Sequence, residues 1–241
     1  MTDAFHEAAL IFRMRRTTGV AALLAALALP RVASPQDLVS FPTDDGGRVY
    51  ADLYGAGNRG VVLAHGGRFT KESWTKQALA LADAGHRVLA IDFRGRGQSR
   101  GGPRLEPGED GLRFDVLAAV RYLRENGAST VAVVGGSMGG GAAAEVATEA
   151  KPGEIDRLVL LAHSPIEHPE RIAVPTLFIL ARDDPQANGT PRLVAIREQY
   201  EKAAGPKELV VLEGSAHAQF IFDTDQGDRL MREILRFLSS R

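Results

Sequence analysis

From residue 38 onward, short apolar segments alternate along the chain with segments of helical periodicity. The apolar segments are rich in consecutive Val, Leu and Ile, which is typical of strands that are buried on both faces of a parallel sheet. The pattern predicts the α/β class: a mainly parallel, doubly wound sheet of about eight strands with helices on both faces. The predicted strands cover residues 38–42, 49–54, 60–65, 87–92, 130–134, 158–162, 175–181 and 208–212.

The first two predicted strands differ from the others because a short turn, Asp44 to Gly47, joins them directly. Such a connection predicts an antiparallel hairpin that opens the sheet. Helical spacing marks residues 71–84, 110–125 and 228–238. In the second of these helices it predicts an apolar face formed by Phe114, Leu117, Ala118 and Leu123. No internal repeat or interdomain linker interrupts the sequence, so residues 35–241 are expected to form one domain.

The composition argues against several classes of function. The chain has 29 Lys and Arg against 30 Asp and Glu. This balance argues against a nucleic-acid binder that relies on broad phosphate neutralisation. The absence of cysteine from the sequence excludes disulfides, thiolate metal sites and a cysteine nucleophile. The sequence also contains no HExxH motif, clustered histidines or acidic calcium loop, so we expect neither a metal nor another cofactor.

The N-terminal segment has a composition of its own. Arginines within residues 13–16 precede an uncharged apolar run at 19–29, and small residues follow at 32–34. This order is typical of a secretory signal peptide, and the run is shorter than the roughly 20 apolar residues that cross a bilayer. We expect residues 1–34 to be a signal peptide and the mature protein to be exported, periplasmic or secreted, without a membrane anchor. The alternatives are a surface helix, which would leave the protein cytoplasmic, and a translation start at Met14.

One turn in the sequence carries a chemical signal. The run Gly135-Gly136-Ser137-Met138-Gly139 fits G-x-S-x-G and lies between a predicted strand and a helical segment of small residues. In this context the pattern predicts a nucleophile elbow, where side chains two residues before and after the serine would collide. The turn would aim the Ser137 hydroxyl out of the sheet and place the Met138 amide at a helix N-terminus, ready to stabilise an oxyanion. The alternative is a glycine-rich turn that only lets a helix pack close to its strand.

A serine nucleophile needs a general base and an acid that orients the base. On this architecture the expected chain order is Ser, then Asp or Glu, then His. Asp183 and Asp184 follow the strand at 175–181, and His217 follows the strand at 208–212 after a short glycine-containing loop. Both places lie past the carboxyl ends of strands, where open α/β sheets have their sites. We favour Asp184 because a proline stiffens the loop after it; Asp183 is the alternative acid, and a capping or surface role is the alternative for His217.

These segments together resemble the α/β-hydrolase family of the serine-esterase type, over residues 38–240. The motifs VVLAHGGR, AIDFRGRGQS, VVGGSMGG, ILARDDP and EGSAH occur in that family's order. The resemblance implies Ser137 as nucleophile, His217 as base and Asp184 as acid. It also implies that the amide of Gly67 supplies a second oxyanion donor beside the amide of Met138.

Three details refine the resemblance. Ala181 stands where the family often has a glycine three residues before the acid. Many members insert a helical lid in the connection that corresponds to residues 163–174, which is too short here, so the resemblance implies a lidless, open site for small or protruding esters. The HGGR segment and the small size also resemble dienelactone-hydrolase-like proteins, although dienelactone hydrolase itself uses a cysteine that this chain lacks.

We therefore expect a serine hydrolase, a carboxylesterase that cleaves a small-molecule ester through an acyl-enzyme. A thioesterase, an acyltransferase or a peptidase would use the same triad, and a non-catalytic binding protein of this fold is the alternative from a different class. Near the expected mouth of the site, three loop residues are either substrate contacts or, as we favour, solvated side chains: Arg68, His163 and His168.

A glycine- and arginine-rich stretch at residues 93–110 could suggest phosphate binding. The sequence has no P-loop pattern, however, and the nearby Glu106, Glu109 and Asp110 offset most of the positive charge. We interpret the stretch as a loop beside the site.

Overall fold

Within the part of the chain that the structure describes, the apolar segments form one sheet of eight strands. A computed structural model describes residues 36–105 and 109–240, so the predicted signal peptide and the Met14 start lie outside the described residues. The strands are β1 (Asp37–Pro42), β2 (Arg48–Tyr54), β3 (Arg59–Ala64), β4 (His86–Ile91), β5 (Thr130–Gly136), β6 (Arg157–Leu161), β7 (Thr176–Ala181) and β8 (Lys207–Leu212). Their order across the sheet is β1-β2-β4-β3-β5-β6-β7-β8.

The pairing directions match the sequence prediction. The β1–β2 and β2–β4 pairs are antiparallel, and the other pairs are parallel. Residues 61–64, 131–134, 158–161 and 177–181 of the central strands are buried. Continuous burial explains why these strands are apolar at successive positions rather than at alternate ones. The predicted mainly parallel sheet with an opening hairpin is confirmed.

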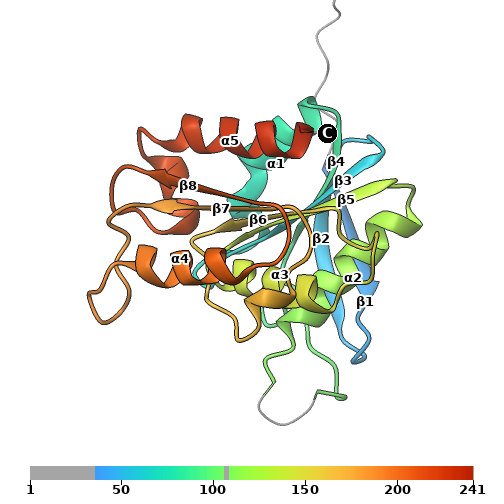
Figure 1. The fold of residues 1–241 in the computed structure, drawn as a ribbon. Coiled ribbons are helices and arrows are strands. Elements are labelled where there is room, and N and C mark those ends of the chain that lie inside the picture. The colour runs from blue at the N-terminus through green and yellow to red at the C-terminus, as the bar shows by residue number, and fades with distance from the viewer. Residues whose placement is uncertain (1–35, 106–108, 241) are drawn as a thin grey trace, which may run out of the picture. The chain divides into compact units, whose positions relative to one another are not determined.

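Helices cover both faces of the sheet (Figure 1). On one face lie α1 (Thr75–Asp83) and α5 (Gly227–Ser239), and on the other lie α2 (Leu112–Glu125), α3 (Met138–Glu149) and α4 (Arg192–Lys202). Short 3-10 helices are η1 (Lys71–Trp74), η2 (Pro169–Arg171) and η3 (Ala218–Asp223). The helix predicted over residues 71–84 is therefore divided between η1 and α1, and the buried ring of Trp74 lies at their junction.

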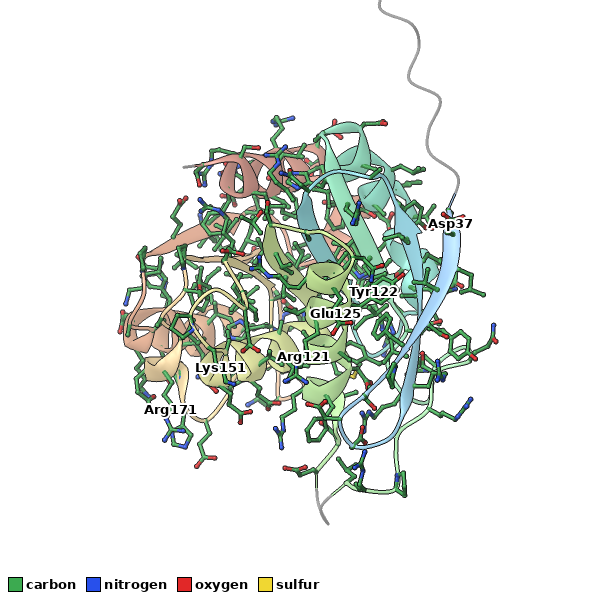
Figure 2. The ribbon with its side chains drawn as sticks, turned by 90° about the vertical axis from the view of Figure 1, so that its right-hand side faces the viewer. Asp37, Arg121, Tyr122, Glu125, Lys151 and Arg171 are labelled. Carbon is green, nitrogen blue, oxygen red and sulfur yellow. The ribbon has the colours of Figure 1, made fainter. Side chains whose placement is uncertain are left out.

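The opening hairpin packs against α2. The ring centroids of Phe41 in β1 and Tyr122 in α2 are 4.9 Å apart, and Arg121 Nη1 lies 2.6 Å from Asp44 Oδ2 in the hairpin turn. Figure 2 shows Arg121 and Tyr122 on α2. These contacts attach the antiparallel strands to the helix layer of the parallel part.

The predicted apolar face of α2 is partly wrong. Ala118 and Leu123 are buried as expected, and the half-buried Leu117 packs against the core, whereas Phe114 is only half-buried. The Phe114 ring instead lies under the guanidinium of Arg113, whose carbon is 4.3 Å from the ring centroid. The buried side of the helix includes a carboxylate that the apolar pattern could not indicate.

That carboxylate is Asp115, and it belongs to a buried ion-pair network. Arg94, in the loop after β4, donates hydrogen bonds from Nη2 to Asp115 Oδ1 at 2.7 Å and from Nη1 to Asp45 Oδ2 at 2.8 Å. Two carboxylates at one buried guanidinium balance its desolvation. Arg94 therefore takes its partners from the hairpin turn and from α2, and not from Glu109 or Asp110 as expected; Glu106 lies outside the described residues.

The connection between β6 and β7 carries only η2 as secondary structure, which is consistent with the absence of a lid. Among the described residues, no helix is both long enough and apolar enough to cross a membrane.

Candidate active site

The predicted nucleophile lies on a strained turn between β5 and α3. Ser137 has φ 51° and ψ −115°, outside the conformations that residues with a side chain ordinarily adopt. Its amide donates to the carbonyl of Leu161 in β6 at 2.9 Å, and its carbonyl accepts from the amides of Gly141 and Ser164 at 3.0 Å each. Strain of this kind amounts to about 1–3 kcal/mol and persists only where the surroundings hold it.

The glycines on either side of this turn are required by close backbone packing. A Cβ atom on Gly135 would lie 2.4 Å from the carbonyl oxygen of Gly139. A Cβ atom on Gly139 would lie 2.5 Å from the carbonyl oxygen of Ala64 and 2.6 Å from that of His65. The G-x-S-x-G pattern therefore follows from how tightly α3 returns onto β5 and β3.

The structure brings together Ser137, His217 and Asp184 from three different loops. His217 Nε2 lies 2.8 Å from Ser137 Oγ, and His217 Nδ1 lies 2.7 Å from Asp184 Oδ2. An ionised carboxylate can only accept a hydrogen bond, so Nδ1 carries the proton. In this tautomer Nε2 has a free lone pair and accepts the hydrogen bond of the serine hydroxyl.

Of the two candidate acids, only Asp184 reaches the histidine. Its side chain is fully buried, whereas Asp183 is exposed and its amide donates to the carbonyl of Gly214 at 2.9 Å. Asp184 also faces Arg192 at the start of α4, whose Nε lies 3.2 Å from the same Oδ2 that accepts from His217. The Arg192 amide donates to the Asp184 carbonyl at 2.8 Å, so the acid is held by both its backbone and its side chain.

The loop after β3 lies against the start of α3. A Cβ atom on Gly67 would lie 3.6 Å from Met138 Sδ, so the two predicted oxyanion donors belong to neighbouring residues. Met138 is the first residue of α3, where amides have no partner within the helix. Across residues 36–105 and 109–240, no side chain or loop carbonyl accepts a hydrogen bond from the amide of Gly67 or Met138.

A buried histidine fixes the loop that contains Gly67. His65 Nε2 accepts the amide hydrogen of Phe93 at 3.3 Å, which leaves the ring proton on Nδ1 to donate to the carbonyl of Gly66 at 2.8 Å. Burial lowers the pKa of His65, which keeps the ring neutral and suited to this pair of bonds. Arg96 donates to the carbonyl of Gly67, so successive peptide units of the loop are held in place.

Gln219 joins this loop to the segment that carries His217. Its Oε1 accepts the amide hydrogen of Gly66 at 2.7 Å, and its Nε2 donates to Ser73 Oγ at 2.7 Å. Gln219 is buried although it lies only two residues after the half-buried His217. Neither Gln219 nor Arg192 is among the site residues predicted from the sequence. The one signal for Gln219 is its place two residues after the predicted base, and no signal marks Arg192.

The three loop residues considered as substrate contacts have different environments. Arg68 is exposed, and His168 is exposed beside Glu170, with Nδ1 3.1 Å from Oε1. His163 contradicts both earlier interpretations because its side chain is fully buried under the first turn of α3, where a Cβ atom on Gly140 would lie 2.6 Å from its own Cβ.

The buried histidines predict a loss of stability in mild acid. Burial lowers the pKa of His163 to about 4, and burial together with the charge of Arg59 lowers that of His86 to about 4. In the unfolded chain both have a pKa of about 6.5. The unfolded state therefore binds more protons between these values, and the free energy of unfolding falls by about 3 kcal/mol per histidine as the pH drops from about 6.5 to about 4.

Urea denaturation at several pH values checks this expectation. His163→Asn removes one titrating group, so the dependence of stability on pH in this window should weaken relative to the wild type. His168→Asn is the matched control, because it makes the same substitution at an exposed histidine. An undiminished pH dependence in His163→Asn would contradict the assignment.

The fold and the site agree with the comparison to known families. A family model described as alpha/beta hydrolase fold matches residues 60–200, and the chain belongs to this family. Family membership supports a hydrolase. It confirms the predicted fold class and family, whereas the dienelactone-hydrolase-like subtype stays a prediction.

Individual relatives carry different names. A non-heme haloperoxidase of Rhodococcus erythropolis is 30% identical over 185 residues, which cover 76% of this chain and 57% of the relative. A non-heme chloroperoxidase of Streptomyces lividans is 29% identical over 193 residues, covering 75% of this chain and 64% of that protein. The chain thus spans less than two thirds of the length of these curated relatives. An esterase of Pyrococcus furiosus has the same fold with a TM-score of 0.70 at 20% identity, covering 85% of this chain and 92% of its own.

Proposed function

We propose that the protein is a serine hydrolase that cleaves a carboxylic ester through an acyl-enzyme. The observation that carries the proposal is the continuous hydrogen-bonded chain from Ser137 Oγ through the imidazole of His217 to the buried carboxylate of Asp184. A serine hydroxyl is a weak nucleophile unless a base accepts its proton as it attacks. In these hydrogen bonds His217 is the base: it lies at hydrogen-bond distance from Ser137 Oγ, in the tautomer that the reaction requires.

In the first half-reaction, Ser137 Oγ attacks the ester carbonyl while His217 Nε2 takes the hydroxyl proton. The carboxylate of Asp184 stabilises the imidazolium that forms. The amides of Gly67 and Met138 donate to the oxyanion, and the N-terminus of α3 adds its dipole. When the tetrahedral intermediate collapses, His217 gives the proton to the leaving alcohol oxygen, and the acyl group stays on Ser137.

In the second half-reaction, water attacks the acyl-enzyme. His217 Nε2 takes a proton from the water, the same two amides hold the new oxyanion, and the carboxylic acid leaves as the proton returns to Ser137 Oγ. The two half-reactions use the same groups in reverse roles. No step requires a metal or a cofactor. The P. furiosus esterase of the same fold is compatible with this assignment but shows the fold alone.

The names of the relatives favour a second candidate activity. The haloperoxidases and chloroperoxidases among them are named for halide oxidation. An acyl-enzyme can react with hydrogen peroxide in place of water, which forms a peracid and regenerates the serine; a peracid then oxidises halide. The ester and peroxide reactions share the acyl-enzyme, so they differ only in the acceptor. Thioester, amide and lactone substrates would likewise share the first half-reaction.

Labelling with a fluorophosphonate probe tests the proposal directly. An activated serine displaces fluoride and retains the phosphonyl group, so we expect one label per chain, located on Ser137 by mass spectrometry. Ser137→Ala should take up no label. Pre-treatment of the wild type with the probe should abolish hydrolysis of esters, and peracid formation in hydrogen peroxide with a carboxylic acid should disappear in parallel if the second activity is present. Folded wild type that takes up no label would overturn the proposal.

A further inference from the structure

Two aromatic side chains lie on the two segments that carry the proposed catalytic groups. Phe69 is two residues after Gly67, and its amide donates to the carbonyl of Gly66 at 3.0 Å. Phe220 is three residues after His217, and its amide donates to the carbonyl of His217 at 3.0 Å. A tight backbone turn therefore links Phe69 to the loop of Gly67, and another links Phe220 to His217.

The two rings contact each other across these segments. Their centroids are 4.8 Å apart at an interplanar angle of 51°. Phe69 is half-buried, with its Cδ2 atom 3.5 Å from the place that a Cβ atom on Gly66 would occupy. The Phe69 ring thus packs on the loop that carries Gly67, and it contacts the ring of Phe220.

The exposure of Phe220 is unusual for a large hydrophobic side chain. Phe220 is 39% exposed, and among the described residues only Leu38 and Val194 are other large hydrophobic side chains with comparable exposure. Leu38 lies on the edge strand β1 and Val194 in α4. Although 39% of its surface is exposed, Phe220 contacts Phe69, and it lies three residues after the proposed base. Met138, which is half-buried next to Gly67, adds a further apolar side chain at the same place.

We propose that Phe69 and Phe220 form a subsite for an aromatic group of the substrate ester. Aromatic rings prefer offset or tilted contacts at centroid distances of about 4.5–7 Å, and an aromatic substrate group gives the exposed ring such a partner. This inference rests on the proposed function, since it names the substrate class of that same site. The aromatic group could belong to the alcohol or to the acyl part of the ester.

A pair of isomeric esters distinguishes these two sources. Benzyl acetate carries the ring on the alcohol, methyl phenylacetate carries it on the acyl group, and methyl acetate has no ring. Acid release by each ester is followed by pH-stat titration, and kcat/KM for each aromatic ester is divided by that for methyl acetate. In the wild type at least one of these two ratios should be about 100, well above 10, which is the size of effect that an apolar pocket contributes.

Phe220→Ala should lower the favoured ratio by about 10-fold or more, mainly through a higher KM, because the subsite holds the ground state and the transition state alike. Phe220→Trp keeps a ring and should retain the ratio, whereas Phe220→Leu keeps apolar bulk without a ring and should lose most of it. Phe69→Leu should reduce the ratio to a smaller extent. Val194→Ala is the control, an exposed apolar residue on α4 that should leave both ratios as in the wild type.

The outcomes separate this inference from the proposed function. If Ser137 takes up the fluorophosphonate label but neither ratio responds to Phe220→Ala, the aromatic subsite is wrong and the hydrolase stands. If Phe220→Ala lowers kcat equally for all three esters, the residue positions His217 and does not bind substrate. If the label is absent and no ester is hydrolysed, both conclusions fail together.

Discussion

Ser137→Ala should lower kcat for a 4-nitrophenyl ester by about 10⁵- to 10⁶-fold, and His217→Ala should lower it by a similar factor. The double variant should be no slower than either single one. Nucleophile and base act as a unit, because the hydrogen bond of 2.8 Å between Ser137 Oγ and His217 Nε2 is useful only while both partners are present. Residual turnover would come from the two proposed oxyanion donors and from substrate binding.

Stopped-flow and steady-state kinetics on the three variants measure this non-additivity. Alanine has a Cβ atom as serine has, so Ser137→Ala retains the backbone strain of the turn and should unfold at nearly the wild-type urea concentration. That measurement is the control for a folded enzyme. Losses that multiply in the double variant would contradict a shared proton-transfer chain and would indicate that the two residues act in separate steps.

Most of the sheet could be predicted from the sequence because its central strands are buried on both faces. Continuous apolar runs give a signal that does not depend on partners, and the observed strand ends differ from the predicted ones by at most about two residues. The amphipathic helix α2 was predicted less well. Its buried side includes Asp115, whose partner Arg94 comes from another loop, and a pattern of apolar residues cannot register a buried ion pair.

The residues of the candidate site differ in the same way: some have a local sequence signal and others do not. Ser137 and His217 could be found because each has a local signal, a glycine-flanked turn or a glycine-containing loop after a strand, and a fixed chain order. Gln219 bonds to Gly66 over a separation of 153 residues, and no local pattern encodes such a pairing. His163 was misplaced because a histidine on a predicted loop gives no indication that the first turn of α3 covers it. Burial arises from packing between segments, so the structure was needed to find it.

Asp184→Asn should lower kcat by about 10⁴-fold, whereas Asp183→Asn should leave it near the wild-type value. The neighbouring aspartates form a matched pair, with the same substitution one residue apart. Asparagine has nearly the same shape as aspartate, but its amide can donate to His217 Nδ1 and so favours the tautomer with the proton on Nε2. In that tautomer the histidine cannot accept the proton of Ser137. Asp183 is exposed, and its backbone amide donates to the carbonyl of Gly214.

Because Arg192 pairs with Asp184, the Asp184→Asn variant needs a stability control. Its Nε lies 3.2 Å from Asp184 Oδ2, so the substitution also leaves a largely buried guanidinium without its counter-ion and should lower the free energy of unfolding by about 3 kcal/mol or more. Activity must therefore be expressed per folded chain, from far-UV circular dichroism and the urea midpoint, at a temperature where the variant is fully folded. A tautomer effect persists after this correction, and it falls on kcat rather than on KM. A variant that regains wild-type kcat per folded chain would show that Asp184 serves stability alone. A larger loss in Asp183→Asn would reverse the assignment of the acid.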